Sequence, residues 1–123
     1  MRKHTNALIV DDEKVIRDLI RDILGGEGPA VGVAAAGTCR EALREVRHQR
    51  FDVIFLDVCL KDGNGVELLR RIRRVTPDAR IYMMTGFSVA EQIEAALAGG
   101  ASGAIYKPFR INEIVAAVRG TAC

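Results

Sequence analysis

Polar side chains with the chemistry for phosphoryl transfer follow several short apolar stretches of the sequence. Asp11 and Asp12 follow the first stretch, Asp57 follows the third, and Thr85 and Lys107 follow the last two. Three carboxylates brought together would repel one another and raise each other's pKa unless a cation were bound. Magnesium suits such a site, because it takes oxygen ligands and is often bound by one or two carboxylates together with phosphate oxygens.

Thr85 and Lys107 would supply a hydroxyl and an ammonium donor to the oxygens of a phosphoryl group. With Asp57 as the nucleophile, the set predicts phosphoryl transfer to a carboxylate. Ordinary structural explanations stay open: Asp12 could cap a helix, Thr85 could simply end a strand, and Lys107 could extend from the edge of a sheet. Asp57 is the hardest to explain in this way, because it interrupts an apolar run at 53–60, where an unpaired charge is costly to bury.

Five short apolar runs alternate with segments of helical period, and these elements must position the polar side chains. The runs lie at 7–10, 31–36, 53–56, 81–84 and 103–106, and apolar residues at helical spacing follow each of them. Capping-box pairs predict three of the helix starts: Thr38 with Glu41, Asn64 with Glu67, and Ser88 with Glu91. Gly25-Gly26, Thr76-Pro77 and Gly99-Gly100 predict three of the helix ends.

This alternation predicts a single α/β domain, residues 1–123, with a parallel sheet and helices on both of its faces. Parallel strands need right-handed crossover connections, which the helical segments would provide. Open sheets of this kind place ligand chemistry at the carboxyl ends of their strands. We therefore expect the candidate residues to meet along one edge of the sheet.

Composition narrows the class of protein. The 49% of hydrophobic and 28% of charged residues are typical of a soluble globular domain, and a net charge of +2 is too small to imply nucleic acid as a direct partner. No apolar run approaches the roughly 20 residues that span a bilayer, and the amino terminus lacks a signal-peptide pattern. Cys39, Cys59 and Cys123 match neither a disulfide set nor a zinc spacing, so we predict a cytoplasmic protein.

Taken together, the motifs of this sequence resemble those of the receiver domain of bacterial two-component response regulators, over essentially the whole chain. The resemblance rests on Val10-Asp11-Asp12-Glu13, Leu56-Asp57 followed by Asn64-Gly65, Met84-Thr85-Gly86, Gly100-Ala101 and Lys107-Pro108-Phe109. It implies a flavodoxin-like (βα)5 fold, a doubly wound five-stranded parallel sheet of strand order 2-1-3-4-5. It also implies a phosphoacceptor that takes part in its own phosphorylation and dephosphorylation, rather than an enzyme.

The resemblance implies a role for each site residue. Asp57 would accept the phosphoryl group from a phosphohistidine on a sensor histidine kinase or histidine phosphotransfer domain, with small acyl phosphates as substitutes. Mg²⁺ would be bound directly by Asp12, Asp57 and the backbone carbonyl of Cys59, and mainly through water by Asp11.

Four further residues would support the acceptor. Lys107 would pair with Asp57 and then with the phosphate, while Thr85 would swing inward to bond a phosphate oxygen. Gly86 would leave room for that oxygen near the backbone. The peptide bond before Pro108 is expected to be cis, which X-Pro bonds tolerate better than others do.

The sequence departs from the family pattern at a few positions. Lys61 stands where a proline usually follows the acceptor by four residues, and Ala104 stands where an aromatic ring usually accompanies the inward threonine. Tyr106, two positions on, could replace that ring or could simply pack on the sheet. Phe87 is expected to hinder the attack of water on the phosphate.

Partners follow from the same resemblance. The kinase would dock along the first helix and the loop after the fifth strand. The fourth helix, fifth strand and fifth helix would face an output domain, a downstream protein or a second copy in a phosphorylation-dependent homodimer, with no direct contact to nucleic acid or membrane. Arginines 70, 71, 73 and 74 are expected to form a solvated face matched to a helix end, with an acidic partner as the alternative.

Other interpretations of the architecture stay open. A flavin carrier should show a phosphate-cradling loop after the first strand, where Asp11 and Asp12 would repel it. An aspartate-nucleophile phosphatase usually carries its paired aspartates after the first strand, whereas Asp57 follows the third. A degenerate receiver that binds partners without phosphorylation is disfavoured by the intact acidic set and Lys107.

Overall fold

Five parallel strands form the central sheet of the computed structural model, which describes residues 4–86 and 90–120. The strands are β1 (Thr5–Val10), β2 (Val31–Ala36), β3 (Val53–Asp57), β6 (Arg80–Thr85) and β7 (Gly103–Tyr106), and they lie side by side in the order β2-β1-β3-β6-β7. The strand order expected from the sequence is therefore confirmed, and each strand covers the apolar run that predicted it.

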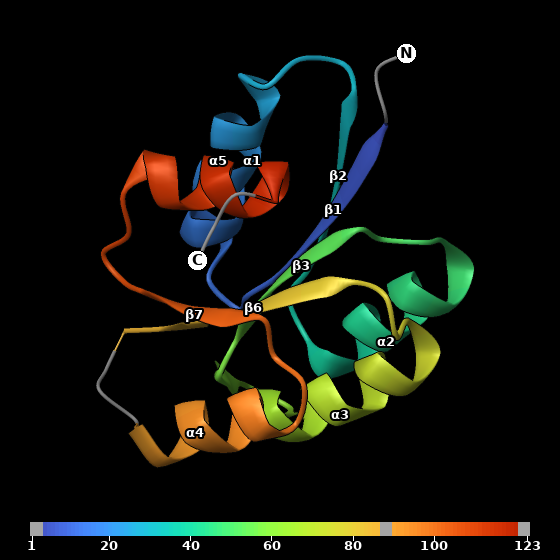
Figure 1. The fold of residues 1–123 in the computed structure, drawn as a ribbon, viewed down its shortest axis with the longest axis vertical. Helices are drawn as coiled ribbons and strands as arrows, with labels where there is room; N and C mark the ends of the chain where they lie inside the picture. The colour runs from blue at the N-terminus through green and yellow to red at the C-terminus, as the bar shows by residue number, and fades with distance from the viewer. Residues whose placement is uncertain (1–3, 87–89, 121–123) are drawn as a thin grey trace.

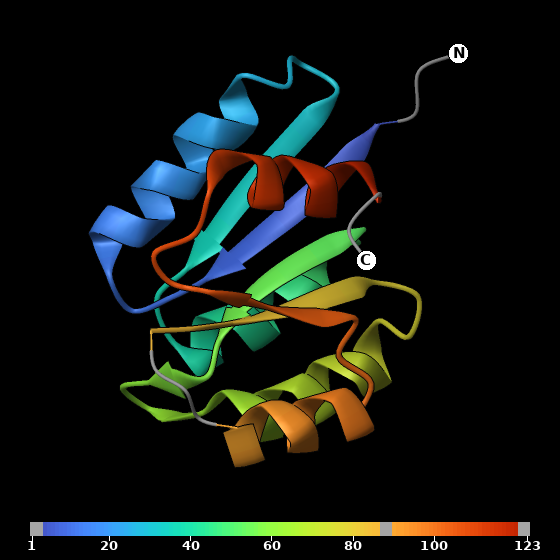
Figure 2. The ribbon, with the colours of Figure 1, turned by 60° about the vertical axis from the view of Figure 1, so that its left-hand side comes forward.

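Five helices cover the two faces of this sheet. They are α1 (Lys14–Gly25), α2 (Cys39–His48), α3 (Gly65–Val75), α4 (Ala90–Ala98) and α5 (Ile111–Arg119). Helices α1 and α5 lie on one face, and α2, α3 and α4 lie on the other (Figure 1). The view in Figure 2 shows the strands passing between these two helical layers. No helix within residues 4–86 and 90–120 is long and apolar enough to cross a bilayer.

Strand β3 is buried along its whole length because both of its faces are covered. Ile54 and Leu56 belong to the core beneath α2, α3 and α4, while Val53 and Phe55 belong to the core beneath α1 and α5. A strand buried on both faces has a continuous apolar sequence, as expected for parallel sheets. Asp57 is the last residue of this strand and stands at its carboxyl end.

Side-chain caps begin two of the helices as the sequence predicts. Thr38 Oγ1 accepts the backbone N–H of Glu41 at 3.1 Å at the start of α2. Asn64 Oδ1 accepts the N–H groups of the first turn of α3, at 2.7 and 3.4 Å. The third predicted cap involves Ser88, which lies outside the described residues, as does Phe87.

A short antiparallel hairpin, which the sequence patterns did not predict, follows β3. It pairs β4 (Cys59–Leu60) with β5 (Gly63–Asn64) and returns the chain toward the end of β3. Gly65 then passes so close to the backbone at Asp57 and Val58 that a β-carbon would collide with it. The absence of a side chain at residue 65 lets α3 begin directly above the end of β3.

The sequence predicts a solvated face of four arginines on α3, and this prediction is wrong for Arg73. Its guanidinium donates hydrogen bonds to the carbonyl oxygens of Pro77 at 3.0 Å and Gly100 at 2.6 Å, and also to that of Ala79. Arg73 thus ties the end of α3 to the loops before β6 and after α4. The remaining arginines of the cluster, at 70, 71 and 74, are exposed.

Candidate functional site

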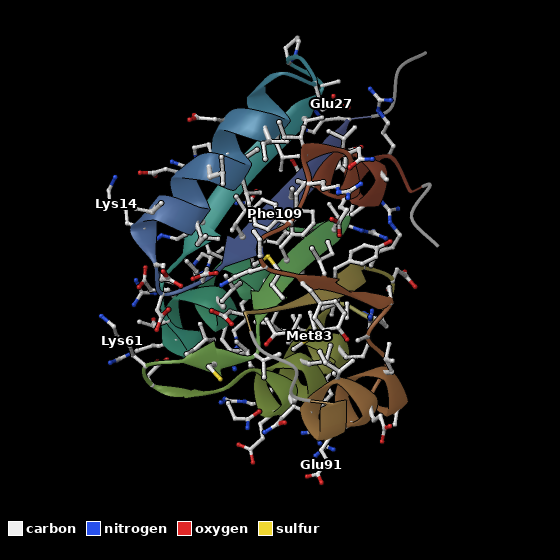
Figure 3. The ribbon with its side chains drawn as sticks, turned by 90° about the vertical axis from the view of Figure 1, so that its left-hand side faces the viewer. Lys14, Glu27, Lys61, Met83, Glu91 and Phe109 are labelled. Carbon is white, nitrogen blue, oxygen red and sulfur yellow. The ribbon has the colours of Figure 1, made fainter. Side chains whose placement is uncertain are left out.

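Three aspartates meet at the carboxyl edge of the sheet, as the sequence predicts. Asp11 and Asp12 follow β1 and Asp57 ends β3, and their ligand oxygens all lie within 4.8 Å of one another. Lys14, at the start of α1, and Lys61, in the turn of the hairpin, lie on this side of the molecule (Figure 3). The fold therefore brings Asp57 to the adjacent pair Asp11 and Asp12, which lie far from it in the sequence.

Asp11 is completely buried and held from both sides. One carboxylate oxygen accepts the backbone N–H of Glu13 at 2.9 Å, and the other accepts the ammonium of Lys107 at 2.7 Å. The guanidinium of Arg17 donates to the backbone carbonyl of Asp11 at 2.7 Å. Glu13, rather than Asp12, occupies the N-cap position of α1, so the half-buried Asp12 does not take the capping role that was its alternative explanation.

Lys107 follows β7 and bridges two of the aspartates. Its ammonium lies 2.7 Å from Asp11 Oδ2 and 3.4 Å from Asp57 Oδ2. Burial lowers the pKa of Lys107, but its hydrogen bond to Asp11 and the charges of both carboxylates outweigh burial and raise that pKa overall. The pairing with Asp57 expected from the resemblance is present, although Asp11 is the nearer partner.

Asp57 is 7% exposed, and its Oδ1 accepts the backbone N–H of Cys59 at 3.2 Å. Burial and the neighbouring charge of Asp11 raise the pKa of Asp57 to about 6, against the opposing effect of Lys107. One ammonium does not balance three carboxylates. Clustered carboxylate oxygens with a residual negative charge are the donor set that hard divalent cations bind, so the site can hold such an ion.

Thr85 and Gly86 border the acidic cluster from the end of β6. Thr85 is buried, and its backbone carbonyl accepts the N–H of Lys107 at 2.8 Å. Gly86 is exposed, and a β-carbon built there would meet no atom within 4 Å, so its backbone is open to solvent. The peptide bond between Lys107 and Pro108 is cis, as the resemblance implies.

The positions that depart from the family pattern are also placed. Lys61 and Cys59 are exposed in the hairpin beside Asp57. Ala104 is partly buried and packs against the core beneath α2, α3 and α4. Tyr106 is 52% exposed and stands in register with Thr85 on the neighbouring strand.

Two residues that contribute to this edge were missed by sequence reasoning. Arg17 holds the backbone of Asp11 from the second turn of α1. Asp62, in the hairpin turn, accepts the N–H groups of Cys39 at 2.8 Å and Arg40 at 3.3 Å, and so caps α2 from a distant segment. Neither contact matches a sequence pattern, because Asp62 binds backbone that lies 23 and 22 residues away, and Arg17 reaches back across the turn between β1 and α1.

Comparison with known proteins gives one consistent family. A family model described as "Response regulator receiver domain" matches residues 7–119. The DNA-binding transcriptional activator DevR/DosR of Mycobacterium tuberculosis is 38% identical over 113 residues, which is 92% of this chain and 52% of that protein. This chain spans about half the length of the first curated relatives that it matches, at 52%, 47% and 50%.

Solved structures agree with this result. A CheY-like response regulator receiver domain protein from Methanospirillum hungatei superposes with a TM-score of 0.89 at 30% identity, covering 94% of this chain and 91% of that one. A response regulator from Burkholderia pseudomallei, solved with a phosphorylated aspartic acid, a calcium ion and citrate, gives 0.86 at 29% identity and covers 93% and 66%.

Proposed function

The chain belongs to the response regulator receiver family and is a phosphoaspartate signalling domain of a two-component system, and on that premise we propose that Asp57 accepts the phosphoryl group. The difference between the two deeply placed carboxylates carries this proposal. Asp11 is completely buried and its two oxygens accept bonds of 2.9 and 2.7 Å, whereas Asp57 is partly accessible and its bonds from the Cys59 N–H at 3.2 Å and from Lys107 at 3.4 Å are both longer.

In the proposed reaction, an oxygen of Asp57 forms a bond to phosphorus while the bond between phosphorus and the histidine nitrogen of the donor breaks. The electron pair of that bond leaves with the imidazole. Lys107 stands beside the oxygen that reacts, at 3.4 Å, and would donate to an oxygen of the transferred group. The Thr85 hydroxyl and the open backbone at Gly86 would receive the remaining oxygens.

We propose Mg²⁺ as the divalent ion of this site. Asp12, Asp57 and the backbone carbonyl of Cys59 would hold it directly, and Asp11 would act mainly through water, because Asp11 is already engaged by Lys107. The ion would neutralise charge on the carboxylates and on the phosphoryl oxygens. The same residues would serve phosphorylation and dephosphorylation, so the domain would take part in its own turnover without being an enzyme for other substrates.

For the phosphoryl donor, we propose a sensor histidine kinase or a histidine phosphotransfer domain that docks on α1. Val15 is 75% exposed and Leu19 is 44% exposed, four residues apart on the same side of the helix. Ile111, at the start of α5 and after the loop from β7, is exposed as well. Apolar side chains left in water beside the acidic edge favour a protein partner at this place.

For the output, we propose the face of α4, β7 and α5, where Leu97 and Tyr106 are exposed. It would contact an output domain, a downstream protein or a second copy in a phosphorylation-dependent homodimer, without a direct role in binding nucleic acid. We further propose that residues 1–123 act as one receiver domain in the cytoplasm, a setting with which the free thiols of Cys39 and Cys59 agree.

The test is incubation with phosphoramidate or acetyl phosphate and Mg²⁺, followed by intact mass measurement. We expect an increment of one phosphoryl group that hydroxylamine removes, that EDTA prevents and that Asp57→Asn lacks. Asp22→Asn is the matched control, because it removes an exposed carboxylate from α1 and should keep the increment. An increment that persists in Asp57→Asn, or none from any donor including the cognate kinase, would refute the assignment.

A further inference from the structure

A groove between α2 and α3 contains three arginines that the receiver function does not use. Its volume is about 280 Å³, and it is lined by Cys39, Arg40, Leu43, Arg47, Asp62 and Arg71. Among the residues that the structure describes, Arg40, Arg47 and Arg71 form no ion pair. We call this surface the arginine groove. Like charges gathered without a partner repel one another, so the fold itself gains nothing from this arrangement.

Interaction with helix dipoles does not explain the arginine groove. Cations are stabilising near the carboxyl end of a helix and unfavourable near its amino end. Arg47 stands in the last turn of α2 and fits this rule, but Arg40 stands in the first turn of the same helix. Arg71 lies in the middle of α3, away from both ends.

Asp62 is the acidic residue among the described residues that line the arginine groove, and it is already engaged. Its two carboxylate oxygens accept the backbone N–H groups of Cys39 and Arg40, and the bond from Cys39 is the main cause of the lowered pKa of Asp62. The charge of Asp62 thus stabilises the amino end of α2. Among the described residues, Asp62 forms no ion pair with the arginines. The guanidinium groups remain free to bind carboxylates from outside.

The two ends of the arginine groove limit what can occupy it. At one end, Asp62 and Glu67 line an adjoining cavity of about 110 Å³. At the other end, near the carboxyl ends of α2 and α3, a cavity of about 320 Å³ is lined by residues that include Val46, Arg50, Val75 and Asp78, and Arg50 is paired with Asp78 at 3.6 Å. A nucleic-acid backbone continuing past either end would meet carboxylates, whereas a short peptide with both acidic and aliphatic side chains would match the guanidinium groups and the exposed Val75.

We propose that the arginine groove docks a short acidic and aliphatic segment of a partner protein. This site lies on the helices α2 and α3, apart from the exposed apolar residues of α1 and from the face of α4, β7 and α5. Binding would rest on charge-assisted hydrogen bonds from three arginines, whose planar guanidinium groups suit carboxylates. It would not require Asp57.

The probe is a fluorescein-labelled 12-residue peptide made of four Leu-Glu-Glu repeats. Fluorescence anisotropy gives its affinity. We expect saturable binding that weakens with added salt, and a loss of about 2- to 5-fold for each of Arg40→Ala, Arg47→Ala and Arg71→Ala. Arg70→Ala is the matched control. It removes an exposed arginine from the same helix, but its side chain lies beside Gly99 of the α4 end, so affinity should not change.

Several outcomes would overturn the proposal. These are no saturable binding, equal losses in Arg70→Ala and the groove variants, equal binding of a peptide with glutamine in place of glutamate, or equal competition by a 12-nucleotide thymidine strand. Self-association of the wild type that the groove variants abolish would assign the surface to a second copy instead. Phosphorylation of each variant, read by intact mass, reports a native fold, and Asp57→Asn should bind the peptide like the wild type, so the two proposals fail separately.

Discussion

Replacing Asp57 by asparagine should stabilise the protein, and the gain should depend on pH. The pKa of Asp57 in the folded protein is raised from 3.8 to about 6, chiefly by burial and by the charge of Asp11. A raised carboxyl pKa means that the folded state binds the proton more tightly than the unfolded state. The associated stability is fully present below pH 3.8 and is lost as the pH rises through about 6.

The size of the effect follows from the two pKa values. One unit of pKa shift corresponds to about 1.4 kcal/mol. Ionisation of Asp57 should therefore cost the wild type about 3 kcal/mol of unfolding free energy at pH 7.5, but only about 1 kcal/mol at pH 4.5. The amide of the Asp57→Asn variant would carry no charge at either pH, while Lys107 would keep its 2.7 Å bond to Asp11. The variant should thus gain about 2 kcal/mol more at pH 7.5 than at pH 4.5.

Urea unfolding in EDTA at both pH values measures this difference. Asp22→Asn serves as the control, since it removes one exposed carboxylate and changes the net charge equally. Mg²⁺ at pH 7.5 should then raise the unfolding free energy of the wild type more than that of Asp57→Asn, because an ion that binds only the folded state stabilises it. A stability gain that is the same at both pH values, or a loss at pH 7.5, would refute the assigned cause of the pKa shift.

Three further substitutions probe the frame of the site. Gly65→Ala should lower the unfolding free energy in urea by at least ~1–3 kcal/mol, because a β-carbon would collide with backbone. Gly25→Ala places its β-carbon in open space at the end of α1, so it should be at least as stable as the wild type. Asn64→Ala should cost ~1 kcal/mol through the loss of the α3 cap, and Asn64→Ser should recover most of it. Lys107→Met should lower the unfolding free energy by ~3–5 kcal/mol at pH 7.5, because it leaves the charge of Asp11 buried without a partner. Adding Asp11→Asn to this variant should restore stability, and a double variant no more stable than Lys107→Met would contradict this explanation.

Much of the fold and the acidic edge was predictable because the signals are local. Runs buried on both faces and two helix caps, at Thr38 and Asn64, located the elements, and parallel strands then required one shared carboxyl edge. The exposure of Val15 and Leu19 was not predictable. Helical spacing shows which residues share one side of α1, but the width of the face that β1, β2 and α5 cover is a tertiary property.

Contacts between distant segments could not be predicted from the sequence patterns for a different reason. The choice of Lys107 between two carboxylates depends on distances of 2.7 and 3.4 Å, which residue spacing does not encode. Arg73 belongs to a run of basic residues, yet it binds three carbonyl oxygens in other segments. A charge run is identical in sequence whether its members face water or satisfy loop backbone, and only the fold separates Arg73 from the exposed Arg71.

The spacing between Asp57 and Asn64-Gly65 has a structural reason that involves no chemistry. The β4 and β5 hairpin reverses the chain within this spacing, so that the N–H of Gly65 reaches the carbonyl of Val58 at 2.8 Å. Only glycine fits there, and Asn64 then caps α3 directly above the end of β3. The motif therefore combines Asp57, which carries the proposed chemistry, with Asn64 and Gly65, which shape the backbone. A carboxylate at the same strand end without this return of the chain would have no Cys59 N–H held against it, because the hairpin positions that group.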